Sequence, residues 1–124
     1  MEFTGFDHIV ISCYSVPDVV AFYRDVLGLE TGEERPGKWA IWFGDSKISL
    51  QDEANKPPLA VGTLPGTANF CVLTKTPVDD ITRQLVDAGV EILARGERQG
   101  AVGTIDSVYF RDPEGNLVEI ANQL

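Results

Sequence analysis

The stretch FRDPEGNLVEI, residues 110 to 120, predicts a strand, a tight turn and a second strand. Asp, Pro, Gly and Asn are concentrated in residues 112–116, and these residue types favour turns. The segment that follows, residues 117–120, is apolar except for Glu119, and it predicts a largely buried strand. A carboxylate in such a strand is either a solvent-facing charge or a functional group.

An earlier part of the chain repeats this pattern. The segment FGDSKISLQ, residues 43–51, aligns with residues 110–119 if one residue is gapped in the turn. In the same way DHIVI, residues 7–11, aligns with ANFCV, residues 68–72. Repeats of this kind indicate the architecture of a chain before any single motif does.

Each repeat also contains one predicted helix. Ser15 and Thr76 are both placed to cap a helix, and Gly28 and Gly89 are placed to end it. The predicted fold is therefore α+β, with two βαβββ modules around a shared cleft. We expect a single domain with module one in residues 1–52, a Pro- and Gly-rich linking loop in 53–66, and module two in 67–124.

The composition excludes some classes of partner. The chain has 124 residues, 19 acidic against 10 basic side chains, and a net charge of -9, which argues against nucleic-acid binding. No apolar run approaches the roughly 18 residues of a membrane span. The two cysteines do not form a disulfide framework, so we expect a cytoplasmic protein with reduced thiols.

Side chains alternate between the two faces of a strand, and this alternation separates apolar from polar residues. One face of the four clearest strands is entirely large and apolar and is predicted to lie under the helices: Ile9, Ile11, Ile48, Leu50, Phe70, Val72, Val118 and Ile120. The opposite face carries His8, Gln51, Asn69 and Glu119, and the repeat pairs His8 with Asn69 and Gln51 with Glu119.

These four polar side chains converge if the two modules curve around a common cleft. Imidazole and carboxylate are good ligands for Zn, Mn, Fe, Co or Ni, and an amide oxygen is a weaker one. Taken one at a time, His8 and Glu119 also fit ordinary roles as a hydrogen-bonded and a solvent-facing residue. The pairing through the repeat favours a common site.

Several motifs resemble the vicinal oxygen chelate superfamily, which includes glyoxalase I, bleomycin-resistance proteins, extradiol dioxygenases and fosfomycin-resistance enzymes. The similar segments are FDHIVISCYSVPDVVAFYRDVLGLE (residues 6–30), FGDSKISLQ (43–51), TPVDDITRQLVDAGVEI (76–92) and SVYFRDPEGNLVEIAN (107–122). They cover nearly the whole chain. The chain is most similar to the small, single-domain glyoxalase-like proteins of this group.

The resemblance implies a divalent metal (Zn, Mn, Ni, Fe or Co) held by His8, Gln51 and Glu119, with Glu119 as the catalytic residue, and a homodimer. Many members have His where this chain has Gln51. An iron dioxygenase needs two His and one carboxylate, so this reaction is disfavoured.

Three functions follow from the resemblance. The first is a metal-dependent glyoxalase-like enzyme, of lyase, isomerase or epoxide-opening type, which acts on a small oxygen-chelating substrate. The second is a metal-free protein that binds and sequesters a drug or metabolite, and the third is a non-catalytic dimeric subunit. For either of the first two, Trp42, Tyr109 and Asn69 are candidates to line the ligand pocket, although the two aromatic residues also suit ordinary packing between sheets.

Arg98 is a further candidate for ligand binding. Gly96, Gly100 and Gly103 surround it and predict a mobile loop, in which Arg98 is placed to bind an anionic group of a substrate. The alternative for Arg98 is a surface charge without a function.

Overall fold

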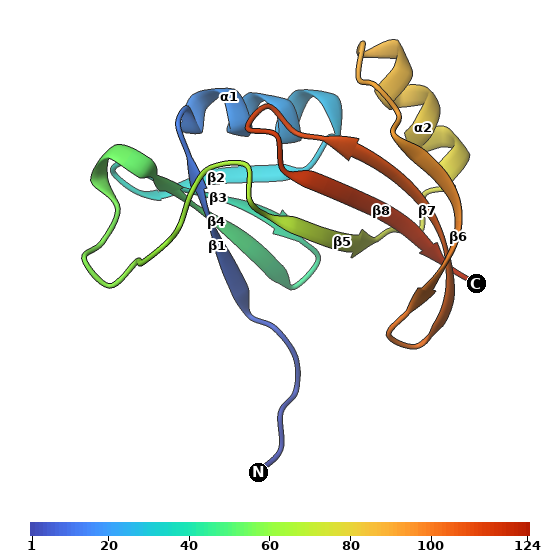
Figure 1. Ribbon diagram of the computed structural model, residues 1–124, viewed down its shortest axis with the longest axis horizontal. Helices are drawn as coiled ribbons and strands as arrows, with labels where there is room; N and C mark the ends of the chain where they lie inside the picture. The colour runs from blue at the N-terminus through green and yellow to red at the C-terminus, as the bar shows by residue number, and fades with distance from the viewer. The chain divides into compact units, whose positions relative to one another are not determined.

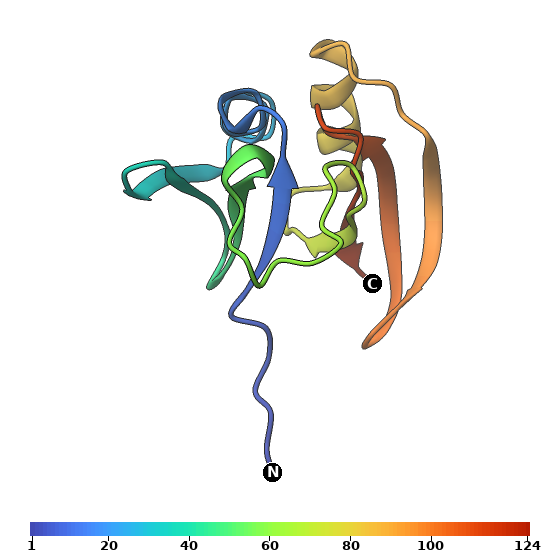
Figure 2. The ribbon, with the colours of Figure 1, turned by 60° about the vertical axis from the view of Figure 1, so that its left-hand side comes forward.

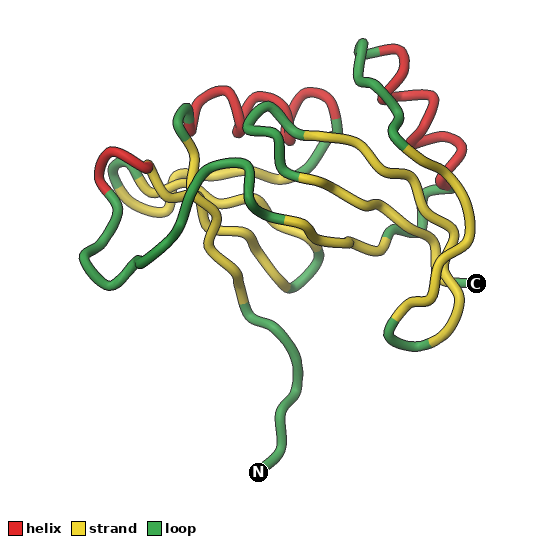
Figure 3. Tube along the Cα trace, viewed as in Figure 1, coloured by secondary structure: helices red, strands yellow, loops and turns green.

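The computed structural model describes residues 1–124, which form two units, Met1–Pro65 and Gly66–Leu124. Each unit contains one four-stranded sheet and one α-helix (Figure 1). Strands dominate both units, and the longest stretch without helix or strand is residues 56–68 (Figure 3).

The first unit has the element order that its part of the repeat predicts. Its elements are β1 (His8–Cys13), α1 (Val16–Ala21), the π-helical turn η1 (Phe22–Val26), β2 (Glu30–Arg35), β3 (Lys38–Phe43), β4 (Ser46–Asp52) and the 3-10 turn η2 (Glu53–Asn55). The strand order is β1-β4-β3-β2, with β1 parallel to β4 and the other pairs antiparallel. Helix α1 contacts β3 and β4, and η2 follows β4 directly (Figure 2).

The second unit repeats this arrangement. It consists of β5 (Asn69–Leu73), α2 (Val78–Asp87), β6 (Ala94–Gly100), β7 (Gly103–Arg111) and β8 (Leu117–Gln123), in the strand order β5-β8-β7-β6. Strand β5 is parallel to β8, and α2 contacts β7 and β8. The predicted fold of two βαβββ modules is confirmed.

The turn in residues 112–116 is held by buried side chains. The carboxylate of Asp112 accepts hydrogen bonds from the backbone N–H groups of Glu114 and Asn116 and from the side-chain amide of Asn116. The Asn116 amide oxygen accepts from the backbone N–H of Ala68, 3.0 Å away, just before β5. The turn therefore connects the β7–β8 hairpin to the strand that begins the unit.

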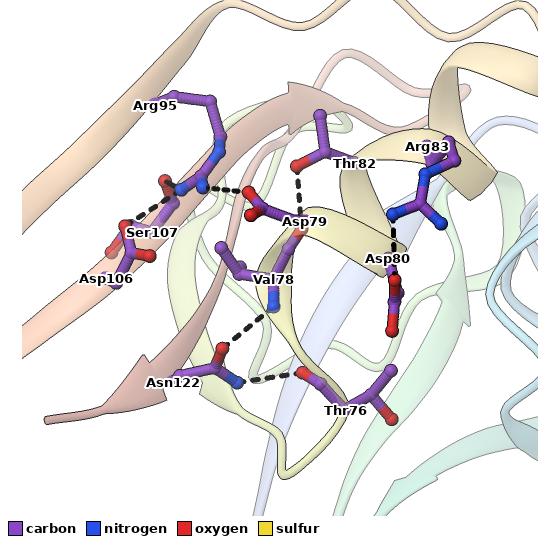
Figure 4. A network of polar contacts seen from close by, with 10 residues as sticks. All are labelled: Thr76, Val78, Asp79, Asp80, Thr82, Arg83, Arg95, Asp106, Ser107 and Asn122. Carbon is purple, nitrogen blue, oxygen red and sulfur yellow. Dashed lines mark hydrogen bonds and ion pairs between the residues drawn. The ribbon is translucent and has the colours of Figure 1, made fainter.

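The two helices begin in different ways. Ser15 caps α1 as predicted, because its hydroxyl accepts from the Asp18 N–H. The matching role for Thr76 is wrong, since α2 begins after Pro77 without a side-chain cap from its own segment. The Asn122 amide oxygen on β8 accepts from the Val78 N–H at 2.8 Å instead (Figure 4).

The same region links α2 to the sheet through a second polar residue. Arg95 of β6 binds the carboxylate of Asp79 in α2 at 2.6 Å and that of Asp106 in β7 at 2.9 Å (Figure 4). It also donates to the backbone carbonyl of Ser107. The first turn of α2 is thus fixed to the sheet at two points.

The predicted division of the strands into two faces agrees with burial only in part. Ile9, predicted to lie under the helices, is 37% exposed, and Phe70 and Val72 are partly exposed. Ile11, Ile48, Leu50, Val118 and Ile120, all predicted to lie under the helices, are in the core. The glycine-rich segment, however, is not a mobile loop, because it forms the antiparallel β6–β7 hairpin. Arg98 lies in strand β6, opposite Ile105.

None of the helices has the length and apolar character of a membrane span.

Candidate functional site

The predicted site residues are distributed over both units, on the sheet faces that point away from the helices. His8, Trp42 and Gln51 belong to the first unit, and Asn69, Arg98, Tyr109 and Glu119 belong to the second.

Glu119 is at the centre of a row of side chains that crosses three strands. The strand register places it opposite Cys71 of β5 on one side and Tyr109 of β7 on the other. Ser107, which is fully buried, donates a hydrogen bond of 2.6 Å from its hydroxyl to Glu119 Oε1. The carboxylate that stood out in the apolar strand is therefore oriented by its neighbours.

Two neighbours of Glu119 are held in their protonated forms. Burial, together with the nearby negative charge of Glu119, raises the pKa of the Cys71 thiol from its ordinary 9.0 to about 11. Burial and a hydrogen bond to Glu119 also raise the pKa of Tyr109. At neutral pH these groups are hydrogen-bond donors, which leaves Glu119 as the acceptor of the cluster.

Arg98 extends this cluster along β6. Its guanidinium carbon lies 5.4 Å from the centroid of the Tyr109 ring, a distance typical of a cation–π contact. Gly96 on the same strand has a φ of +138°, a conformation that favours glycine, and Arg98 Nη1 lies 3.4 Å from the position that a Cβ would occupy there. Asn69 is exposed at the start of β5, where it pairs with Leu117, two residues before Glu119 on β8.

His8 is exposed at the start of β1 and has a carboxylate partner. Its Nδ1 lies 2.7 Å from Asp7 Oδ2, and this hydrogen bond to His8 lowers the pKa of Asp7. Histidines that bind metals commonly have such a carboxylate on one ring nitrogen, with the other nitrogen available to the ion. Nε2 of His8 is the nitrogen available here.

Gln51 is buried at 7% exposure and its amide nitrogen is engaged twice. It donates to the Ser12 hydroxyl at 2.8 Å and to the Thr63 hydroxyl at 3.3 Å. Its amide oxygen takes part in neither bond and is the atom available to a ligand.

The strand register corrects the predicted pairing of Gln51 with Glu119. In the first unit His8 lies opposite Lys47, and in the second Asn69 lies opposite Leu117. Glu119 is two residues beyond Leu117, and the residue two beyond Lys47 is Ser49. If His8 and Asn69 are counterparts, as the repeat indicates, Ser49 is the counterpart of Glu119.

Gln51 is consequently far from His8 within its own sheet. It pairs with Ser12, four residues beyond His8 along β1. At a rise of roughly 3.3 Å per residue this separates the two positions by about 13 Å along the strands. A role for Gln51 as a ligand stays a prediction.

A pocket of about 470 Å³ opens on the first unit, and the sequence did not predict it. Gln51 and Ser49 line it together with Val10, Trp39 and the cationic side chains of Lys38 and Lys47. Strand alternation was the available signal, because Lys38 and Lys47 share a face with Gln51. Trp42 lies on the same face, half-buried, with the Lys47 ammonium 6.0 Å from its ring centroid.

The predicted metal ligands provide one imidazole, one carboxylate and one amide. No three His, Cys, Asp or Glu side chains lie together in an arrangement that would hold an ion. The individual donor types nevertheless suit a divalent metal, because His8 is oriented by Asp7 and Glu119 by Ser107. The donor chemistry fits a modestly bound ion.

Comparisons with known proteins agree with the fold and the motifs. The chain is 38% identical over 117 residues to the virulence protein STM3117 of Salmonella typhimurium, covering 93% of this chain and 81% of that protein. The crystal structure of STM3117 superimposes with a TM-score of 0.94 over 100% of both chains. The glyoxalase domain-containing protein RDO1 of Mycosarcoma maydis is 32% identical over 118 residues, covering 94% of this chain and 66% of RDO1.

A more distant structure shares the fold. Lactoylglutathione lyase from Agrobacterium tumefaciens is 24% identical and superimposes with a TM-score of 0.77, over 98% of this chain and 96% of that one. Residues 5–120 match the family model of the Glyoxalase/Bleomycin resistance protein/Dioxygenase superfamily. The chain belongs to this superfamily.

Proposed function

We propose that the protein is a metal-dependent enzyme of the glyoxalase type, a lyase, isomerase or epoxide-opening enzyme that acts on a small substrate with adjacent oxygen atoms. The observation that carries the proposal is the setting of Glu119. This carboxylate is oriented by Ser107 and lies in a row with two protonated groups, Cys71 and Tyr109. An oriented carboxylate of this kind is suited to moving a proton.

The implied ligands are His8 and Gln51 in the first unit and Glu119 in the second. The separation of about 13 Å between His8 and Gln51 along the strands disfavours Gln51 as a ligand of the same ion as His8. When bound, a divalent ion supplies a Lewis acid that stabilises negative charge on a substrate oxygen. His8 would hold the ion through Nε2, since Asp7 engages Nδ1. Glu119 would hold the ion through its carboxylate, whose Oε1 also accepts the hydrogen bond from Ser107.

The remaining residues of the cluster orient and bind. Ser107 fixes the rotamer of Glu119, so its loss would weaken the activity without removing the carboxylate. The Tyr109 hydroxyl donates its proton to Glu119, so its oxygen is left to accept a hydrogen bond from a substrate, and Asn69 on β5 offers both a donor and an acceptor. Arg98, held over the Tyr109 ring, supplies a fixed positive charge for an anionic part of the substrate.

Metal analysis of protein purified without a His tag tests the proposal. After loading with Mn, Ni or Zn and removal of free ion, we expect close to one equivalent, and His8→Ala and Glu119→Ala should each lose it. Glu97→Ala is the matched control, because Glu97 is an exposed carboxylate of β6 outside the cluster. Retention below about a tenth of an equivalent by the unaltered protein would contradict metal dependence.

Activity is then screened with and without the bound metal. The substrates are the hemithioacetal of glutathione and methylglyoxal, fosfomycin, and catechols as the disfavoured class. Metal-stimulated turnover of either of the first two, lost in Glu119→Gln, is the expected outcome.

The second candidate is a metal-free protein that binds a small molecule. It is favoured by the pocket of the first unit, whose volume of about 470 Å³ lies in the range of small-molecule sites. Ligand binding without metal retention or turnover would favour this candidate over the enzyme.

A further inference from the structure

The pocket of the first unit concentrates positive charge in a chain whose net charge is -9. Lys38, Lys47 and Arg35 line it, and Glu34 is the single acidic side chain among the lining residues. A local excess of cations against an acidic background indicates a site for an anion.

One of these cations is already neutralised. The Lys47 ammonium lies 2.7 Å and 2.8 Å from the two oxygens of Glu34, so this pair cancels its own charge. Elsewhere in the chain Arg24, Lys56, Arg83 and Arg95 are paired with carboxylates in the same way.

Lys38 and Arg35 differ from these residues. Neither makes an ion pair or a side-chain hydrogen bond, although they face each other across the β2–β3 pair. Lys38 is half-buried, whereas Arg35 is exposed. An unpaired ammonium that is partly shielded from water interacts more strongly with an anion than a fully solvated one does.

The other side chains of the pocket indicate what the anion is attached to. Val10 offers apolar surface, and the Ser49 hydroxyl offers a hydrogen-bond donor. We infer that this pocket binds a small molecule with a carboxylate or phosphoryl group at Lys38 and an apolar or aromatic body beside Val10. Arg35 provides the second, outer charge for the same group.

This inference deepens the second candidate function, which rests on the same pocket. The lining includes neither His8 nor Glu119, although it shares Gln51 with the predicted metal ligands. The test therefore uses protein that has been treated with a chelator. Titration calorimetry measures the binding of benzoate, phenylphosphonate and benzylamine, three probes of similar size and different charge. We expect both anions to bind and benzylamine not to bind, and binding should weaken as salt is raised.

Variants assign the charge to Lys38. Loss of a charge-assisted hydrogen bond should weaken binding of the better anion by about tenfold or more in Lys38→Gln. Lys38→Arg keeps the charge and should restore most of the affinity. Lys75→Gln, which removes an exposed lysine of the second unit that has no ion pair, should bind as the unaltered protein does.

Three results would overturn the inference: benzylamine binding as tightly as the anions, no anion binding to the unaltered protein, or equal affinity in Lys38→Gln and Lys75→Gln. Circular dichroism spectra of each variant confirm that it is folded. Anion binding to chelated protein that retains no metal would support this site while contradicting metal dependence, so the two proposals fail separately.

Discussion

Replacing Asn116 by Ala should destabilise the protein substantially, because this side chain makes one hydrogen bond within the turn and another to the segment that precedes β5. Asn116 is 1% exposed, and its amide nitrogen donates to Asp112 Oδ2 at 2.9 Å. Its amide oxygen accepts from the Ala68 N–H at 3.0 Å. The substitution removes a hydrogen bond to a charged acceptor and leaves a backbone donor unpaired, which together cost about 3 kcal/mol.

Urea unfolding followed by far-UV circular dichroism measures this loss. Asn55→Ala is the control, because Asn55 is exposed and its bond to Asp52 is long, at 3.4 Å. The control should change the free energy of unfolding by less than about 0.5 kcal/mol. A loss below about 1 kcal/mol in Asn116→Ala would refute the reasoning that these two bonds hold the turn.

A second substitution at the same position separates the two bonds. Asn116→Asp keeps an acceptor for the Ala68 N–H but places a second carboxylate against Asp112. Repulsion between the two charges should make it at least as unstable as Asn116→Ala at neutral pH. If Asn116→Asp were instead as stable as the unaltered protein, the bond to Asp112 would have no energetic importance.

Two further predictions concern the second unit. Asn122→Ala removes the cap of α2 together with two hydrogen bonds donated to the carbonyls of Thr74 and Thr76. It should lower the free energy of unfolding in urea by about 2 kcal/mol. A change no larger than that of Asn55→Ala would contradict this prediction. Cys71, although exposed, should react with iodoacetamide at pH 8 about 100-fold more slowly than an ordinary thiol. Because its pKa is raised from 9.0 to about 11, the fraction of Cys71 present as thiolate at pH 8 is about a hundredth of that of an ordinary thiol. The rate of modification should rise with pH and should be higher in Glu119→Gln. The buried Cys13 should stay unmodified and is the internal reference. Equal rates in Glu119→Gln and the unaltered protein would show that Glu119 does not act on the thiol.

The sequence predicted the faces of the strands correctly, but it did not predict the register between them. Gln51 and Ser49 lie on the same face, so an error of two residues leaves every side chain on its expected side. Hydrophobic alternation therefore could not distinguish Gln51 from Ser49 as the counterpart of Glu119. The hydrogen-bonded pairing of β1 with β4 makes this distinction.

The sequence predicted a helix cap correctly only where the capping residue is close to the helix in sequence. Ser15 was predictable as a cap because its partner, Asp18, is three residues away. The cap of α2 was not, because Asn122 is 44 residues from Val78. The pocket around Lys38 is built from three consecutive strands, β2, β3 and β4, so strand alternation alone could have placed its cations on one face.

The capping of α2 by a residue of the last strand has a consequence for how the second unit folds. An isolated helix of ten residues is marginal in water, and α2 has no cap from its own segment. Its first turn is completed only when β8 is in place to supply Asn122. Helix α2 and the sheet should therefore form in one cooperative step late in chain synthesis, and a chain that ends before Asn122 should lack a stable α2 as well as part of a strand.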